Sequence, residues 1–449
     1  MLLSLFCGKY GYMNDLTITE LSTKIGHKAT VRGWLHKRRD LGGMIFVVLR
    51  DRSGLVQAII KDETEQAKLQ GLQNGTVLRI SGLIVQEARA VGGVEIQEPT
   101  LEVISPVTEV MPIEIDKPLD HKSENFDVLF ENRVVGLRNL NERAIFRVQA
   151  TLGRGFRDYF EKRDFVEIHT PKLLAGATEG GAEVFKTDYF GEKATLAQSP
   201  QFYKQMMVGV FERVFEMAPV YRAEPSVTTR HMSEYISLDA EVGFITFDEL
   251  LAMVGELLGH MVGYAWEHNE ADLLLLGAVK PMLPSKLPQL KMSEVHELYQ
   301  KATGEKAIGE KDLFPAEERW ICEYAARELG SEAVFVTDWP AAEMKFYHLA
   351  DDEHPEIAVR ADLIFRGVEV VTTSMREHRY DKLVAQLKDI AGGDPQSDGF
   401  KYFVSAFKYG MPPHGGFGMG LERVTQELIG LGNVKEASLF PRDTKRLAP

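Results

Sequence analysis

Hydrophobic and polar positions alternate between residues 28 and 105, as they do in half-buried β-strands. Turn-forming pairs such as Gly42-Gly43 and Asn74-Gly75 separate the alternating runs. One polar helix, Glu63–Leu72, is predicted between the third and the fourth run. The predicted strands are Ala29–His36, Met44–Arg50, Leu55–Lys61, Val77–Val85 and Val94–Ser105. This order of strands and helix is typical of an OB-fold, a barrel that often binds oligonucleotides.

The pattern changes to a helical period beyond an acidic, proline-containing connector at residues 106–127. Residues 248–330 are predicted to be mainly helical, beginning with an amphipathic helix at Phe247–Trp266, and a last helix follows Gly420. One face of a further helix, after Arg138, carries Ile145, Val148, Leu152, Phe156 and Tyr159. The predicted strands are Phe165–His169, Thr195–Gln198, Glu212–Arg222, Glu234–Ile245, Ala333–Thr337, Ala358–Phe365 and Val368–Thr372. Strict β-α-β alternation is missing, so we predict an antiparallel-rich α+β domain.

The length of 449 residues predicts two or three domains. The composition, 44% hydrophobic and 26% charged, is typical of a soluble globular protein and excludes a disordered or fibrous one. A net charge of −14 means that any nucleic acid must be bound by local patches. Two cysteines, Cys7 and Cys322, cannot form a disulfide framework and favour a cytoplasmic protein.

Residues 1–12 are apolar but lack the basic lead and the long apolar core of a signal peptide. We interpret them as an N-terminal extension, with Met13 as an alternative start. No run approaches the about 18 apolar residues of a membrane-spanning helix.

The stretch from Val220 to His231 places cationic and acidic side chains at the end of a predicted strand. Arg222 and Glu224 are two residues apart and therefore face the same side, and Arg230 follows in the loop. Fixed arginine donors of this kind suit an anionic ligand. In isolation, a surface hairpin with solvated charges is the more frequent explanation.

The stretch Gly415–Arg423 is rich in glycine. Alternating glycines let a ligand approach the backbone, and Arg423 at the start of the next helix can reach a phosphate. The spacing matches neither a Walker motif nor a dinucleotide fingerprint. Alone, it is more often a tight turn into a packed helix.

Together, these stretches resemble signatures of class II aminoacyl-tRNA synthetases of the aspartyl, asparaginyl and lysyl subgroup, from about residue 15 to the end. A third signature is the helix and strand that end at Pro171, and residues 439–447 are similar to the aspartyl branch, of the archaeal, non-discriminating type. The resemblance implies an α+β fold with an N-terminal OB-fold β-barrel and an antiparallel-sheet catalytic domain. The expected division is an extension at 1–12, the anticodon-binding barrel at 13–105, a hinge at 106–130 and the catalytic domain at 131–449, with a helical insertion at about 248–330.

The segment Gln198–Gln205 is similar to the substrate-binding segment of aspartyl enzymes. A side-chain carboxylate needs a cationic partner such as Lys204, and a neutral amide would leave that ammonium unpaired at a cost of several kcal/mol. Arg376 is similar to the family arginine that binds the same carboxylate as a fork. The other amino-acid contacts that the resemblance implies are Gln201 and Asp239, for the α-ammonium, and Glu179, in a loop that closes over the substrate.

The resemblance also implies an ATP site. Arg222 and Arg423 are the expected catalytic residues, the first bridging the α-carboxylate and the α-phosphate and the second at the γ-phosphate. The other expected ATP contacts are Glu224, Arg230, His231, Met232, Glu369, Gly418 and Gly420. Hard oxygen ligands beside a triphosphate suit Mg²⁺, and the expected ligands are Glu241, Glu369 and Thr372.

One segment departs from the family pattern. Aspartyl enzymes usually carry Ser-Gly-x-Gln-Arg where this chain has residues 372–376, Thr-Thr-Ser-Met-Arg. We expect Thr373 to add bulk close to substrate and metal, and Met375 to remove an amide. Asparagine therefore stays open as the substrate, and so does a non-catalytic paralogue that binds nucleotide or RNA.

The predicted barrel carries candidate anticodon contacts. Phe46 can stack on a base and Gln57 can read a base edge, and both match family positions, although Phe46 could instead belong to the barrel core. His36 stands where relaxed enzymes of this type tend to carry histidine and discriminating ones tryptophan. We therefore expect aspartylation of tRNA(Asn), alone or together with tRNA(Asp), and an amidotransferase acting on the product. The resemblance further implies a homodimer.

Overall fold

The structure is a computed structural model that describes residues 15–119, 126–176, 183–225 and 228–448. The chain divides into two compact units, Met1–Glu142 and Arg143–Pro449. The N-terminal extension, Met13 and Glu179 lie outside the described residues. None of the helices in the described ranges is both long enough and apolar enough to cross a membrane.

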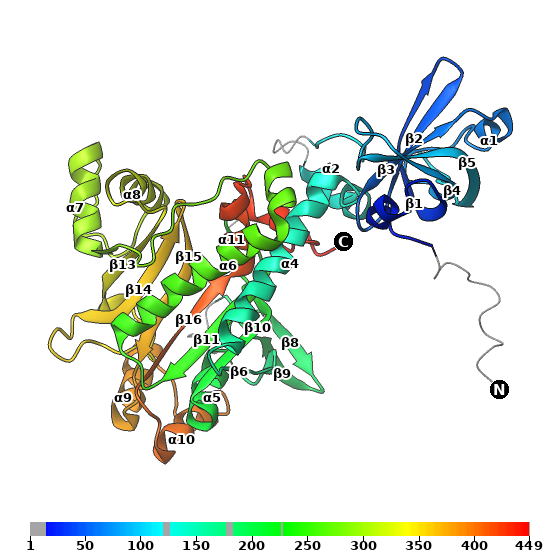
Figure 1. Cartoon of the computed structure of the whole chain (residues 1–449). Helices are drawn as coiled ribbons and strands as arrows, with labels where there is room; N and C mark the ends of the chain where they lie inside the picture. Colours follow the sequence, from blue (N-terminus) through cyan, green and yellow to red (C-terminus); the bar gives the residue numbers. More distant parts are fainter. Residues whose placement is uncertain (1–14, 120–125, 177–182, 226–227, 449) are drawn as a thin grey trace. The chain divides into compact units, whose positions relative to one another are not determined.

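The first unit contains a closed barrel with the strand order β1-β2-β3-β5-β4 (Figure 1). A short helix, α1 (Glu63–Ala67), follows β3 and is capped by Asp62, which accepts a hydrogen bond from the backbone nitrogen of Glu65. This arrangement confirms the predicted OB-fold. The strands are β1 (Lys28–Leu41), β2 (Met44–Arg50), β3 (Leu55–Ile60), β4 (Val77–Gln86) and β5 (Val94–Ser105).

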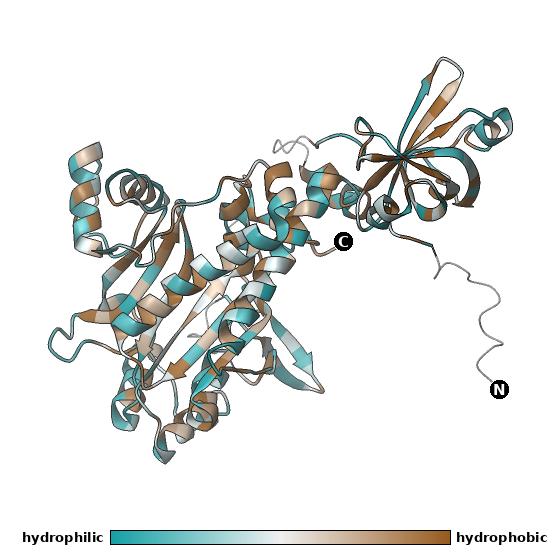
Figure 2. Cartoon of the chain, in the orientation of Figure 1, coloured by the Kyte–Doolittle hydropathy of each residue, from teal (hydrophilic) through white to brown (hydrophobic). Residues whose placement is uncertain are grey.

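Alternation places every second side chain of β2 and β3 inside the barrel. Phe46 and Gln57 occupy the positions between and lie on the outer surface, where both are half-buried. Phe46 is therefore not part of the barrel core. Figure 2 shows hydrophobic and hydrophilic segments mixed along these strands. The inward residues of the two strands include Ile45, Val47, Leu49, Val56, Ala58 and Ile60.

The second unit is built on an eight-stranded sheet in the order β12-β13-β14-β15-β16-β11-β10-β6 (Figure 1). Strands from β13 to β10 pair antiparallel, and the outer pairs β12–β13 and β10–β6 are parallel. This sheet confirms the predicted α+β class. The strands are β6 (Val166–Glu167), β10 (Arg213–Tyr221), β11 (Glu234–Gly243), β12 (Gln289–Lys291), β13 (Ala333–Pro340), β14 (Ile357–Phe365), β15 (Val368–Arg376) and β16 (His414–Gly420). A separate small sheet has the order β7 (Leu173–Leu174), β9 (Glu192–Leu196), β8 (Lys186–Tyr189).

Two long helices, α4 (Leu140–Glu161) and α6 (Phe247–Leu275), cover one face of the large sheet (Figure 1). Leu152 of α4 and Leu258 of α6 share a core with Phe417 of β16. Since this core takes alternate residues of the strands, the side chains between them point to the opposite face. That face carries the cavity described below.

Helices α7 (Met292–Thr303) and α8 (Pro315–Glu328) flank β13 and share a small core with it. The structure also contains helices that the pattern of the chain did not predict. The remaining helices are α2 (Phe126–Glu131), α3 (Arg133–Gly136), α5 (Gln201–Phe211), α9 (Tyr380–Ala391), α10 (Lys401–Ala406) and α11 (Leu421–Ile429).

The glycine-rich stretch is a strand of this sheet, so its interpretation as a turn was wrong. Residues 415–420 lie in β16, which pairs with β11 on one side and with β15 on the other. Glycine has a low strand propensity, but backbone hydrogen bonds to two neighbours hold the stretch extended.

Candidate active site

Gly418 and Gly420 of β16 line a cavity, and Gly416 precedes them on the same strand. Gly416 pairs with Glu241 of β11 and Ser374 of β15, and Gly418 pairs with Asp239. A Cβ atom on Gly416 would lie 2.2 Å from Oε2 of Glu241, so a larger residue would displace that carboxylate. The glycines therefore leave a trough between the acidic side chains of β11 and the polar side chains of β15.

The cavity above this trough has a volume of about 370 Å³ and collects most of the predicted contacts. They come from β11, β15, β16, α5, α11 and the segment between β10 and β11. The predicted residues that line it are Gln201, Lys204, Arg222, Glu224, Arg230, His231, Met232, Asp239, Glu369, Thr372, Arg376, Gly418, Gly420 and Arg423.

At one end of the cavity two cations and two carboxylates form a buried quartet. The Lys204 ammonium donates to Oδ1 of Asp239 at 2.8 Å and lies 3.5 Å from Oε2 of Glu241. Arg376 donates through Nε to Oε1 of Glu241 at 2.8 Å. Burial favours a raised pKa for Glu241, but Arg376 and Lys204 outweigh it and hold the pKa below its ordinary value. Glu241 is therefore ionised, and it lies beside both cations of the quartet.

The surroundings of Glu241 give no support to its predicted role as a metal ligand. The side chain is fully buried and is not among the described residues that line the cavity. Its two oxygens face Arg376 and Lys204, so both are occupied by cations of the protein. Glu241 instead holds Arg376 and Lys204 in place.

Helix α5 brings Gln201 and Lys204 to the cavity together. The two residues are one turn apart and therefore lie on the same helix face. The helix begins directly after Pro200, which fits the preference of proline for a helix start. The buried amide nitrogen of Gln201 has no hydrogen-bond partner within the described part of the chain, so this amide is available to a ligand.

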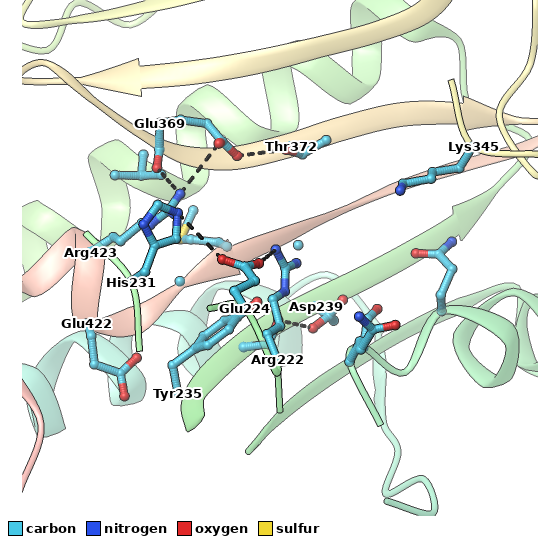
Figure 3. Close-up of a pocket in the computed structure, with 18 of the residues that line it drawn as sticks. Arg222, Glu224, His231, Tyr235, Asp239, Lys345, Glu369, Thr372, Glu422 and Arg423 are labelled. Carbon is cyan, nitrogen blue, oxygen red and sulfur yellow. Dashed lines mark hydrogen bonds and ion pairs between the residues drawn. The ribbon is translucent and has the colours of Figure 1, made fainter. Parts of the chain in front are cut away.

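Arg222, Glu224 and His231 meet at the other end of the cavity (Figure 3). The Glu224 carboxylate lies between the other two, 3.6 Å from Nη1 of Arg222 and 3.7 Å from Nε2 of His231. The Arg222 guanidinium also lies over the ring of Tyr235, with 5.6 Å to its centroid. Burial, together with Arg423, lowers the pKa of His231, so its imidazole is neutral near pH 7.

Glu369, Thr372 and Arg423 form the adjoining wall (Figure 3). Thr372 donates to Oε1 of Glu369 at 2.8 Å, and Arg423 donates to the Glu369 carbonyl at 2.8 Å. Glu369 and Thr372 are three residues apart and yet share one face, because the pairing with β14 shifts register around Val370. Desolvation favours a raised pKa for Glu369, but Arg423 and the Thr372 hydroxyl outweigh it and keep the carboxylate ionised.

The two unusual residues of this strand, Thr373 and Met375, point away from the cavity. Both are buried, and Met375 belongs to the core under α4 and α6. The expectation that Thr373 adds bulk beside the substrate was therefore wrong. Odd-numbered positions of β15 beyond the bulge face the core, and Thr372 and Arg376 face the cavity.

The sequence did not single out several polar residues on the β14 side. Asp362 pairs in register with Thr372 and accepts a hydrogen bond from Arg360 at 2.7 Å. His348 also lines the cavity, and burial together with Arg376 lowers its pKa well below the ordinary value. Lys345 reaches toward the cavity from the wall opposite His231 (Figure 3). Arg360 and Asp362, charged residues two apart in an apolar strand, were the signal available in the sequence.

The predicted anticodon contacts lie on the barrel of the first unit. Phe46 is opposite Arg39 on β1 and Ile59 on β3. The Gln57 amide donates to Oε2 of Glu95 at 2.9 Å. His36 sits where the pairing of β1 with β2 shifts register, and only 7% of its surface is exposed.

Comparison with known proteins gave consistent matches. Residues 125–444 match the family model of tRNA synthetases class II (D, K and N), and residues 29–104 match that of the OB-fold nucleic acid binding domain. The aspartate–tRNA(Asp/Asn) ligase of Thermus thermophilus is 44% identical, over 96% of this chain and 99% of that protein. The aspartate–tRNA(Asp) ligase of Pyrococcus horikoshii is 38% identical, over 98% and 99%. The crystal structure of asparaginyl-tRNA synthetase from the same organism, complexed with asparaginyl-adenylate, superposes with a TM-score of 0.89 at 28% identity, over 97% of this chain and 100% of that chain.

Proposed function

Because the chain belongs to the class II tRNA synthetases of the D, K and N group, we propose that it joins L-aspartate to tRNA through an aspartyl-adenylate. The observation that carries the choice of aspartate is the pair of buried cations, Lys204 and Arg376, in the cavity that also holds Arg222 and Arg423. A neutral side-chain amide offers no negative charge to this pair, whereas a carboxylate does.

The quartet accounts for how the amino acid is held. The substrate ammonium would donate to Asp239 and to the amide oxygen of Gln201, while the side-chain carboxylate would bind Lys204 and Arg376. Each charge of the substrate then meets an opposite charge that is already oriented, so little reorganisation is needed on binding. Glu179 is proposed to complete this site.

ATP would occupy the end of the cavity with Arg222, Glu224 and His231. An oxygen of the aspartate α-carboxylate attacks the α-phosphorus, the new P–O bond forms, and the bond to pyrophosphate breaks. Arg222 stabilises the charge that develops at the α-phosphate, and Arg423 the charge of the leaving group. Glu224 accepts from the adenine amino group, and Met232, Gly418 and Gly420 complete the nucleotide pocket. The terminal ribose hydroxyl of tRNA then attacks the adenylate carbonyl and AMP leaves.

The oxygen ligands at the wall of the cavity fit Mg²⁺. Glu369 is ionised and keeps 36% of its side chain exposed, and the Thr372 hydroxyl lies beside it. The chemistry suits a hard cation, which would neutralise phosphate charge when bound. We propose Glu369 and Thr372 as ligands. The acidic residue close behind them is Asp362, which pairs in register with Thr372, and not Glu241.

The barrel would select the tRNA, with Phe46 stacking on an anticodon base and Gln57 reading a base edge. The buried position of His36 suggests that it acts through the shape of β1 and not by direct contact. We propose charging of tRNA(Asn) as well as, or instead of, tRNA(Asp), with an amidotransferase converting the product. The proposal includes a cytoplasmic homodimer with the barrel at 13–105, a hinge at 106–130 and the catalytic domain at 131–449.

Pyrophosphate exchange with aspartate and with asparagine, measured in parallel, tests the amino acid. Exchange with aspartate supports the proposal, exchange with asparagine alone replaces it by an asparagine ligase, and exchange with neither points to a non-catalytic paralogue. Aminoacylation of tRNA(Asp) and tRNA(Asn) transcripts then tests the nucleic acid. Strict restriction to tRNA(Asp) would remove the dual specificity.

A further inference from the structure

Arg230 lines the cavity beside His231, but its guanidinium is bound to the protein behind the cavity wall. Nη1 donates to Oε2 of Glu318 at 2.6 Å, and Nη2 donates to the carbonyl of Gly367 at 2.9 Å. The side chains of Arg230 and Glu318 are 15% and 14% exposed. A bidentate arrangement of this kind holds an arginine in one orientation.

Glu318 belongs to α8, in the helical segment inserted between β11 and β13. It is not among the described residues that line the cavity. The oxygen that accepts from Arg230 also accepts from the backbone nitrogen of Glu369 at 3.3 Å. Oε2 of Glu318 therefore connects the segment that carries His231 to the start of strand β15.

The same point of β15 is fixed from a third direction. Arg423 of α11 donates to the carbonyl of Glu369 at 2.8 Å, so both backbone groups of Glu369 are bound by side chains from other elements. Three separate elements of the proposed triphosphate site thus meet behind the cavity: the segment with Arg230 and His231, strand β15, and helix α11. Glu318 is the group that links the first to the second.

We propose that Glu318 is a positioning residue for ATP, acting through Arg230 and the backbone of Glu369 without touching the nucleotide. Its carboxylate fixes the position of Arg230. This fixes the distance between His231 and Glu369, the two residues between which the triphosphate would bind. If Glu318 only stabilised the fold, its substitution would lower the stability of the protein and would affect the KM for ATP and the KM for aspartate alike. A positioning role predicts a selective loss of ATP binding.

The test compares Glu318→Gln with Glu323→Gln in the full chain. Glu323 is an exposed residue of the same helix and serves as the matched control. The KM for ATP and the KM for aspartate are measured separately in pyrophosphate exchange, together with the thermal unfolding of each variant. We expect the KM for ATP to rise by roughly 10- to 100-fold in Glu318→Gln, since a displacement of about 1 Å can have that effect. The KM for aspartate should change less than about twofold, and Glu323→Gln should resemble the wild type.

A double-mutant cycle tests the path through Arg230. If Glu318 acts through that arginine, adding Glu318→Gln to Arg230→Met should change the KM for ATP little beyond the single Arg230→Met variant. Additive effects of the two substitutions would overturn the proposal, and so would an unchanged KM for ATP or equal rises for both substrates. Should Glu318→Gln fail to fold, Glu318→Asp, which keeps the charge on a shorter side chain, is compared in the same assays.

The inference rests on the proposed function, and the assay separates the two. Absence of aspartate-dependent exchange in the wild-type protein would refute the proposed function. Normal exchange in the wild type with the same KM for ATP in a folded Glu318→Gln variant would refute the role of Glu318 alone.

Discussion

Replacing Lys204 by methionine removes one cation from the buried quartet and nearly preserves the length of the side chain. In the structure the ammonium is 2% exposed and is held by Asp239 at 2.8 Å and by the carbonyl of Phe417 at 2.7 Å. Methionine can replace neither hydrogen bond. Asp239 keeps its contact with Ser237, and Glu241 keeps Arg376, so the variant carries one uncompensated negative charge.

The magnitude follows from the burial of the pair. Removing one partner of a buried, hydrogen-bonded charge pair costs about 2–5 kcal/mol in binding. The substrate carboxylate would face one cation instead of two, beside an unpaired Asp239. We expect kcat/KM for aspartate to fall by roughly 30- to 4,000-fold, taking 1.4 kcal/mol for each factor of ten. The KM for ATP should stay near its wild-type value because Arg222 and Arg423 are unchanged.

Pyrophosphate exchange at varied aspartate and at varied ATP measures both constants. Lys193→Met, at an exposed position of β9, is the matched control for loss of a lysine. Thermal unfolding separates lost binding from lost folding, since breaking a buried pair also destabilises the native state. The reasoning is refuted if a folded Lys204→Met variant keeps kcat/KM for aspartate within about threefold of the wild type.

Three further predictions concern other parts of the molecule. Burial lowers the pKa of His414 to about 4, so on acidification the unfolded chain binds a proton before the folded one does. The free energy of unfolding should therefore fall by about 3 kcal/mol between pH 6.5 and pH 4. Urea unfolding measures this loss, which should be smaller in His414→Asn. Phe46→Ala should raise the KM for tRNA in aminoacylation by roughly 5- to 150-fold, the value of about 1–3 kcal/mol of stacking, and equal tRNA kinetics in the variant would contradict the contact. Thr372→Val removes the hydroxyl that orients Glu369 and should raise the half-saturating Mg²⁺ concentration in exchange by roughly 10- to 100-fold, which a Mg²⁺ titration checks.

Strong local patterns were sufficient to predict the barrel and most of the large sheet. The alternation of buried Val56, Ala58 and Ile60 with half-buried neighbours marks β3 because one of its faces is in the core. Helix α5 was not predicted because its own apolar and polar residues do not separate into two faces. The structure buries residues of both kinds, such as Phe202 and Gln205. Strand β15 continues to Arg376, four residues beyond the predicted end, because pairing with β14 and β16 satisfies its polar segment.

The predicted site residues converge on one cavity, but their individual partners depend on tertiary pairing. Glu241 and Asp239 alternate on one strand and look equivalent in the sequence. The structure separates them because Gly416 makes room for Glu241 below the cavity, where Arg376 covers it. Asp362 was not predicted for the same reason, because it lies close to Thr372 only through the register between β14 and β15.

The contacts of Arg376 at the end of β15 bear on the proposed choice of substrate. A guanidinium has five N–H donors. Arg376 uses Nε and one N–H of Nη2 on Glu241, and Ser374 accepts one N–H of Nη1. One N–H therefore remains on each terminal nitrogen, and such a pair suits the two oxygens of a carboxylate. A side-chain amide offers one oxygen and one NH2 group, and the NH2 group would face a donor. The contacts with Glu241 and Ser374 thus leave Arg376 with a pair of donors that suits a carboxylate, as the proposed choice of aspartate over asparagine requires.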